Sequence, residues 1–167
     1  MIDGTISMKR VNLIMQNIRY QSLISEIAEL EKNRKFCRHT MEHFLDTARI
    51  MYILNLEENA ALPKDVIYAA ALLHDTGRAE EYRNGTPHHK ASVDIALHIL
   101  PECGFDESEI RQITEAIDRH REKTVPSGNR LGELLYRADK LSRQCYSCGA
   151  ADECYWSDDK KNHTLRY

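Results

Sequence analysis

The stretch that decides the fold is Ala69-Ala70-Ala71-Leu72-Leu73-His74-Asp75-Thr76-Gly77-Arg78. Five apolar residues precede an adjacent histidine and aspartate, so two polar side chains emerge directly from what should be a buried helix. An unpaired carboxylate in such a place costs several kcal/mol or is neutralised. A divalent cation is the obvious compensation, and imidazole nitrogen with carboxylate oxygen suits manganese, iron, zinc, nickel or cobalt.

Outward from this stretch, apolar residues recur at a spacing close to 3.6 along almost the whole chain, which predicts an all-α fold. Pro63 and Pro87 mark helix starts, and Asp106 followed by Glu109 is the pattern of a capping box that predicts a further start. The predicted helices cover residues 11–34 (with a break near Tyr20), 38–56, 63–77, 86–101, 106–120 and 130–142. We expect a single domain, residues 1–167, built as a bundle of about six or seven helices.

The composition excludes several classes of protein. Hydrophobic residues make up 42% and charged residues 29% of the 167 residues, and the net charge of −3 with scattered Lys and Arg argues against binding of a nucleic-acid polymer. The sequence contains no run of about 18 apolar residues, so no membrane span is predicted. Residues 1–10 lack the features of a secretory signal. Five cysteines, three of them close together, favour thiol or metal chemistry in a reducing compartment. We therefore expect a cytoplasmic protein.

Further polar residues lie on other predicted helices, mostly near an end, where side chains can converge on a cleft. They are His43, the pair His88-His89, His120 and Asp139. A lone histidine in an amphipathic helix is more often a core or surface residue than a ligand, and His98 and His163 are interpreted in that way.

The order of these residues along the chain resembles the motif of the HD superfamily of metal-dependent phosphohydrolases. The family pattern is a histidine, an adjacent His-Asp pair and a distant aspartate, which this sequence supplies as His43, His74-Asp75 and Asp139. The flanking residues 43–49 and 70–78 are also similar to the family, with Arg78 where a lysine is usual. The resemblance covers residues 36–143 as an HD-domain core and leaves residues 144–167 as an irregular, Cys-rich and polar tail.

The resemblance implies a metal held by His43, His74, Asp75 and Asp139. Branches of the family with two metals add two histidines, and His88 and His120 fall where these are expected, so Asp75 would bridge the two ions. Arg78 would hold a phosphate oxygen beside Asp75.

Three other residues are weaker candidates for the site. His39 lies one helical turn before His43 and could reach the site or hold a ligand in place. His89 competes with His88, which the family spacing favours. Lys140 follows a ligand and either contacts phosphate or is solvated.

The implied activity is hydrolysis of a phosphomonoester or phosphodiester of a nucleotide or similar small phosphorylated metabolite. Two alternatives remain: a metal-bound sensor or interaction module with weak or no hydrolysis, and a diiron oxygenase on the same fold. Substrate specificity is expected in the loops at 84–87 and 121–129. The substrate, the metal, the number of ions and the oligomeric state are left open.

The cysteines pose a separate question. Cys37 lies six residues before His43, and Cys145 lies six residues after Asp139. If the two helices are antiparallel, both steps move the same way by about 9 Å, which would bring Cys37 beside Cys145, Cys148 and Cys154. Four thiols suit a structural zinc or an iron–sulfur cluster, and zinc is favoured. The alternative is that Cys37 is a core residue and the others are loose thiols.

Overall fold

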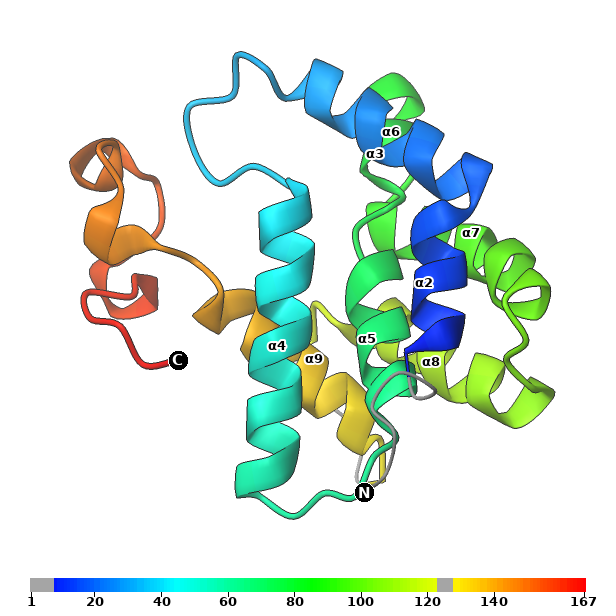
Figure 1. Ribbon diagram of the computed structural model, residues 1–167. Helices are drawn as coiled ribbons and strands as arrows, with labels where there is room; N and C mark the ends of the chain where they lie inside the picture. Colours follow the sequence, from blue (N-terminus) through cyan, green and yellow to red (C-terminus); the bar gives the residue numbers. More distant parts are fainter. Residues whose placement is uncertain (1–7, 123–127) are drawn as a thin grey trace.

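The computed structural model describes residues 8–122 and 128–167, and within these ranges every regular element is a helix (Figure 1). This confirms the predicted all-α fold. The elements are α2 (Lys9–Gln16), α3 (Ile18–Leu30), α4 (Met41–Glu57), α5 (Lys64–Leu73), α6 (Arg78–Asn84), α7 (His88–Glu102), α8 (Glu107–Arg119), α9 (Arg130–Leu141) and the short 3-10 turns η1 (Cys145–Ser147), η2 (Ala151–Glu153) and η3 (Asp158–Lys160).

In the described part of the chain, no helix combines the length and the apolar character that crossing a membrane requires.

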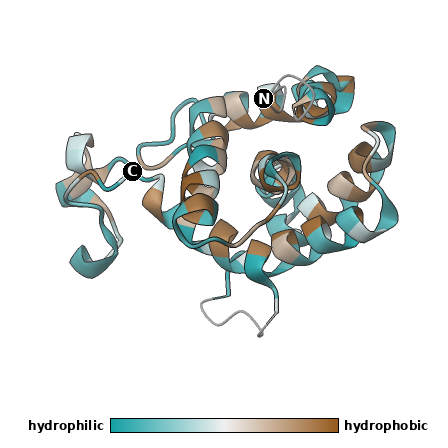
Figure 2. Cartoon of the chain, turned by 60° about the horizontal axis from the view of Figure 1, so that its bottom comes forward, coloured by the Kyte–Doolittle hydropathy of each residue, from teal (hydrophilic) through white to brown (hydrophobic). Residues whose placement is uncertain are grey.

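Helix α5 is the centre of the bundle. It contacts α2, α4, α7, α8 and α9, and Figure 2 shows it nearly end-on with other helices around it. Its residues from Ala69 to Leu73 are completely buried. Three consecutive alanines let neighbouring helices approach closely, and the apolar run leaves no side exposed to water. The His74-Asp75 pair that ends this helix is therefore held deep in the protein.

Several boundaries differ from the sequence predictions. The N-terminal segment divides at Asn17 rather than near Tyr20, because the Asn17 side chain accepts hydrogen bonds from the backbone N–H groups of Arg19 and Tyr20 and caps α3, which then ends at Leu30. Helix α4 starts at Met41, after Thr40 as its cap, rather than at residue 38. Helix α5 ends at Leu73 rather than at Gly77.

Helix α6 was not predicted, because among its residues only Ala79 is buried and so it lacks an apolar period. By contrast, the capping box predicted for α8 is confirmed, since Asp106 and Glu109 each accept a hydrogen bond from the other's backbone N–H. The loop predicted around Pro126 lies outside the described residues.

The segment after α9 projects to one side of the bundle (Figure 1). It contains only the three 3-10 turns, as expected for an irregular tail. An ion pair between Lys35 and Glu153 and an edge-to-face contact between Phe36 and Tyr155 join it to the α3–α4 linker. The Asn162 amide donates hydrogen bonds to backbone carbonyls at the end of α9 and just after it.

Arg10 fixes the first described helix to the bundle. Its guanidinium donates to Asp65 at the start of α5, with Nε–Oδ2 at 2.8 Å, and to Glu109 at the start of α8, with Nη2–Oε1 at 2.8 Å. It also lies 4.2 Å from the centre of the Phe105 ring. One side chain thus ties three helices together.

We predict that Arg10→Gln lowers the free energy of unfolding by about 2 kcal/mol, because it leaves two partly buried carboxylates without their charged partner. Lys32→Gln, which removes an exposed ion pair to Glu29, should change stability by less than about 0.5 kcal/mol. Denaturant unfolding measures both.

The pH dependence provides a further check on this interaction. The hydrogen bond from Arg10 lowers the pKa of Glu109 below its ordinary value. The stabilisation is therefore present at neutral pH and is lost as the pH falls through the carboxyl range. An Arg10→Gln deficit that stays the same at acidic pH would contradict this account.

Candidate metal centre

The ends of several helices converge on the buried Asp75. His43 lies in the first turn of α4, His74 and Asp75 directly follow α5, and His88 is the first residue of α7. His120 is the C-cap of α8, and Asp139 lies near the end of α9. These are the six residues that the family resemblance assigns to metal, and the structure brings all of them together.

One group consists of His43, His74, Asp75 and Asp139, whose ligand atoms all lie within 4.8 Å of one another. His74 Nε2 lies 3.1 Å from Asp75 Oδ2. His43 Nε2 lies 3.6 Å from Asp139 Oδ1 and 3.8 Å from Asp75 Oδ2. Two imidazoles and two carboxylates surround one point, which is a suitable donor set for a divalent first-row metal.

A second group consists of Asp75, His88 and His120. Here Asp75 uses its other oxygen: Oδ1 lies 3.2 Å from His88 Nε2 and 3.7 Å from His120 Nε2. Asp75 is 1% exposed, so neither oxygen is solvated to any extent. The carboxylate stands between the two groups and presents one oxygen to each.

The hydrogen bonds of the histidines orient Nε2 toward the centre. His74 Nδ1 donates to the carbonyl of Ala71, and His120 Nδ1 donates to the carbonyl of Ile117, each at 2.6 Å. His88 Nδ1 lies 3.0 Å from the Glu81 carboxylate. A partner on Nδ1 fixes the ring and leaves Nε2 to bind metal, which is the usual arrangement of histidine ligands.

Several of these nitrogens have no hydrogen-bond partner. Among the described residues, Nε2 of His43, His74 and His88 is buried without one. Buried polar atoms are almost always satisfied, and here the three unsatisfied nitrogens all face the carboxylate of Asp75, while those of His43 and His74 also face Asp139. The residues present therefore fit a bound cation.

The charges of the site also favour a cation. Burial would raise the pKa of Asp75, but His74 and Arg78 outweigh it and hold that pKa well below the ordinary value. Burial opposes protonation of His74, yet Asp75 and Asp139 raise its pKa to about 10. The carboxylates thus stay ionised and attract positive charge. By contrast, burial lowers the pKa of His120 to about 3, so this imidazole is neutral.

His39, a weaker candidate from the sequence, also reaches the site. Its Nε2 lies 3.4 Å from Asp75 Oδ2. Its Nδ1 and its backbone N–H both contact the carboxylate of Glu31, each at 2.6 Å. Glu31 is only 2% exposed and also accepts a hydrogen bond from the hydroxyl of Tyr82.

Sequence reasoning missed three residues that hold the histidines, namely Glu31, Glu81 and Ser142, whose hydroxyl lies 3.2 Å from His43 Nδ1. They carry no recognisable motif. Glu31 caps the end of α3 and Glu81 lies on the unpredicted α6. Only the packing of distant helices brings them to the site.

The two basic residues predicted to contact phosphate form hydrogen bonds with carboxylates of the site. Arg78 donates from Nε to Asp75 Oδ1 at 3.1 Å and from Nη1 to Glu81 at 2.9 Å. Lys140 donates to Asp139 Oδ2 at 2.6 Å. A role in holding phosphate stays a prediction for both.

The other histidines lie outside the two groups. His89 stacks edge-to-face on His88, but its ring nitrogens belong to neither group. His98 and His163 each contact a backbone carbonyl of their own segment, as expected for residues without a role in the site.

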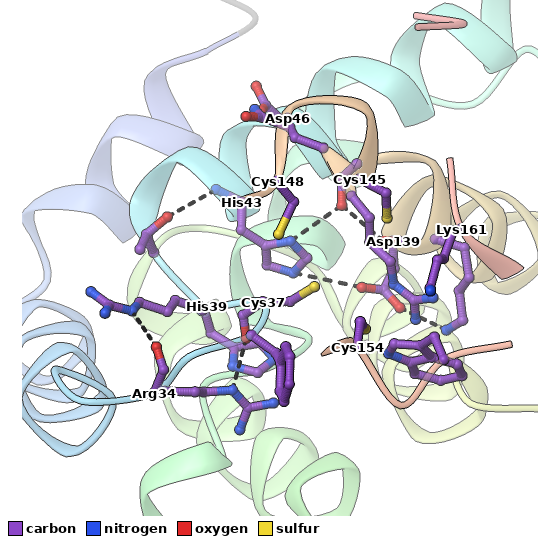
Figure 3. Close-up of a pocket in the computed structure, with 18 of the residues that line it drawn as sticks. Arg34, Cys37, His39, His43, Asp46, Asp139, Cys145, Cys148, Cys154 and Lys161 are labelled. Carbon is purple, nitrogen blue, oxygen red and sulfur yellow. Dashed lines mark hydrogen bonds and ion pairs between the residues drawn. The ribbon is translucent and has the colours of Figure 1, made fainter. Parts of the chain in front are cut away.

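The site opens onto a cavity of about 610 Å³ (Figure 3). Nine basic side chains line this cavity, against three acidic ones, so its wall attracts anions. The basic residues are Arg34, Lys35, Arg38, Arg78, Arg121, Lys140, Arg143, Lys160 and Lys161. Of the two loops expected to set specificity, the described part of the second contributes Arg121.

The four cysteines of the predicted clamp line the same cavity. Cys37 is exposed, which contradicts the alternative of a core residue. Desolvation and the nearby thiols of Cys145 and Cys154 raise the pKa of Cys37, while Arg143 opposes the rise. Binding of metal by the four cysteines stays a prediction.

Gly77 sets the distance between the His-Asp pair and α7. A Cβ atom at this position would lie 2.2 Å from the backbone oxygen of His88 and 2.6 Å from the backbone nitrogen of Ser92. The Gly77 N–H donates to the Ser92 hydroxyl at 2.8 Å. Only glycine allows α7 to come this close, which in turn carries His88 to Asp75.

Comparison with known proteins gives three findings. A family model described as HD domain matches residues 40–144. An uncharacterized protein of Clostridium beijerinckii is 44% identical over 160 residues, which cover 96% of this chain and 100% of that protein. A crystal structure described as a predicted HD superfamily hydrolase from an uncultured Thermotogales bacterium matches with a TM-score of 0.58 at 24% identity, covering 84% of this chain and 80% of that one. This structural likeness supports the fold.

We predict that Gly77→Ala destabilises the protein by about 2 kcal/mol or more and weakens metal binding, because α7 must move away from Asp75. Gly149→Ala is the matched control, since a Cβ there meets nothing within 4 Å. Thermal unfolding and calorimetric metal titration measure the two effects. Equal behaviour of the two variants would show that the close approach is unimportant.

A second prediction concerns Glu81. Glu81→Gln should lower metal affinity about 10- to 100-fold, because the amide holds the His88 ring less firmly and supports its basicity less. Glu80→Gln, on the same helix but paired outward with Arg83, should leave affinity unchanged. Metal titration of both variants tests this prediction. Unaltered affinity in Glu81→Gln would show that this carboxylate does not support metal binding.

Proposed function

The chain belongs to the HD domain family, a family of metal-dependent hydrolases, and on this premise we propose that it hydrolyses phosphate esters of a nucleotide or similar small phosphorylated metabolite. His43, His74, Asp75 and Asp139 would hold one divalent ion, and His88 and His120 would hold a second, with Asp75 shared. Manganese, iron, nickel, cobalt and zinc all suit these ligands.

The observation that carries the proposal is the position of Asp75 between the two groups. Its Oδ2 lies 3.1 Å from His74 Nε2 and its Oδ1 lies 3.2 Å from His88 Nε2. When bound at such a site, divalent metal supplies a Lewis acid for phosphoryl oxygens and a water of lowered pKa. The role of the chain is to hold these ligands rigidly around a buried carboxylate.

Arg78 and Lys140 would bind the phosphate. Both line the cavity and both already contact the carboxylates of the site. In its present contacts Arg78 uses Nε and Nη1, and its planar guanidinium has further N–H groups to offer a phosphate oxygen. A substrate phosphate would therefore lie between these cations and the ligand groups.

The cavity supports a small anionic substrate. A volume of about 610 Å³ is in the range of ordinary small-molecule sites. The basic wall would draw in a phosphorylated compound and offset its charge. Phe36, Tyr155 and Trp156 also line the cavity, and aromatic rings there offer stacking surfaces for a nucleotide base.

We predict that the protein releases phosphate or a phosphomonoester product from at least one compound in a screen of nucleotides and phosphorylated metabolites with manganese, nickel or cobalt. Asp75→Asn should reduce this activity by more than about 100-fold and lower metal content, because it removes a charge shared by both groups. The control is Asp94→Asn, an exposed position on α7, which should retain full activity.

The alternatives predict different outcomes of the same screen. Tight binding of a compound without turnover under any metal would contradict the proposal and favour a sensor. Oxygen consumption that requires iron, without hydrolysis, would contradict it in favour of an oxygenase. Full activity of Asp75→Asn would exclude the proposed role of the carboxylate.

A further inference from the structure

The tail after Ser142 lacks a core of its own. From residue 143 to residue 167 no residue is buried, and the regular structure is limited to three turns of three residues each. Each ordered residue loses backbone entropy that apolar burial must offset. Segments with so little buried surface usually depend on a cross-link or a bound metal for their order.

The structure places four cysteines where such a link would act. Cys37 lies in the linker between α3 and α4, and Cys145, Cys148 and Cys154 lie in the tail. All four are free thiols and line the same cavity, with their sulfur atoms projecting into it (Figure 3). The four residues therefore lie on two separate segments, and both segments border the cavity.

The local backbone orients the three thiols of the tail. Cys145 begins η1 and Cys148 caps it, with the Cys148 N–H donating to the Cys145 carbonyl at 3.3 Å. In a 3-10 turn, residues three apart lie on the same face, so these two thiols share one side of the turn. Cys154 caps η2 with the same kind of bond to Ala151.

We propose that Cys37, Cys145, Cys148 and Cys154 bind a separate metal centre through their thiolates, and that this centre fastens the tail to the bundle. Four thiolates are the usual complement of a structural zinc or an iron–sulfur cluster. The centre is independent of the His/Asp site, because no cysteine belongs to either of the two ligand groups among the described residues. It does not depend on the proposed phosphohydrolase activity.

The separation of the sulfur atoms favours an iron–sulfur cluster over zinc. Zinc–sulfur bonds of about 2.3 Å in a tetrahedron place the sulfurs about 3.8 Å apart. No three of the four Sγ atoms lie within 4.8 Å of one another. A polynuclear cluster joins thiolates that are farther apart, and Arg38, Arg143 and Lys161 on the same cavity wall would balance its negative charge.

The test uses the full-length protein purified without oxygen. Iron, zinc and acid-labile sulfide are measured together with the number of thiols that react before and after treatment with a chelator. We expect iron with a matching amount of sulfide and four protected thiols. Cys37→Ser and Cys145→Ser should each lose the sulfide and expose the tail to limited proteolysis.

Two controls separate this centre from the His/Asp site. Cys103→Ala changes the remaining cysteine, which is buried in the core, and should retain the sulfide. Asp75→Asn should also retain it, because that site binds no sulfide. One zinc per chain with four protected thiols would support the thiolate centre and overturn the iron–sulfur assignment. Four freely reactive thiols with no cysteine-dependent metal would overturn the proposal altogether.

Discussion

The structure depends on one constraint, a carboxylate buried at the centre of a helical bundle. Asp75 follows the most buried helix and is 1% exposed. A charge in such a place must be compensated, and the compensation comes from every direction: five histidine rings lie within 3.8 Å of its oxygens, and so does the Arg78 guanidinium. The helix ends are arranged around this charge, and the cavity and its basic wall surround the opening to solvent.

Much of this arrangement could be predicted from the sequence because its signals are local. The apolar period gives the helices, and an adjacent His-Asp pair after five apolar residues locates the buried charge. Each further ligand is a polar residue near a helix end, and the resemblance to the HD superfamily assigns these residues to metal. The capping box of α8 was predictable for the same reason, since its two residues are three apart.

The parts that could not be predicted depend on contacts between distant segments. Glu31 looks like any acidic residue at the end of an amphipathic helix, and only the fold buries it against His39. Helix α6 has no apolar period, yet it supplies Glu81 to His88. The sequence predicts Gly77 as the end of a helix. In the structure Gly77 matters because a side chain there would collide with α7. No pattern within a single segment reveals such requirements.

The distribution of the ligands along the chain has a consequence for biosynthesis. His43 lies on α4 and Asp139 on α9, and these helices pack together although almost a hundred residues separate them. A chain still emerging from the ribosome without α9 has its histidines but lacks one of the two carboxylates that balance them. The complete site therefore forms only when α9 closes against the first part of the bundle, so the proposed metal site would gain its full set of ligands only after α9 has emerged.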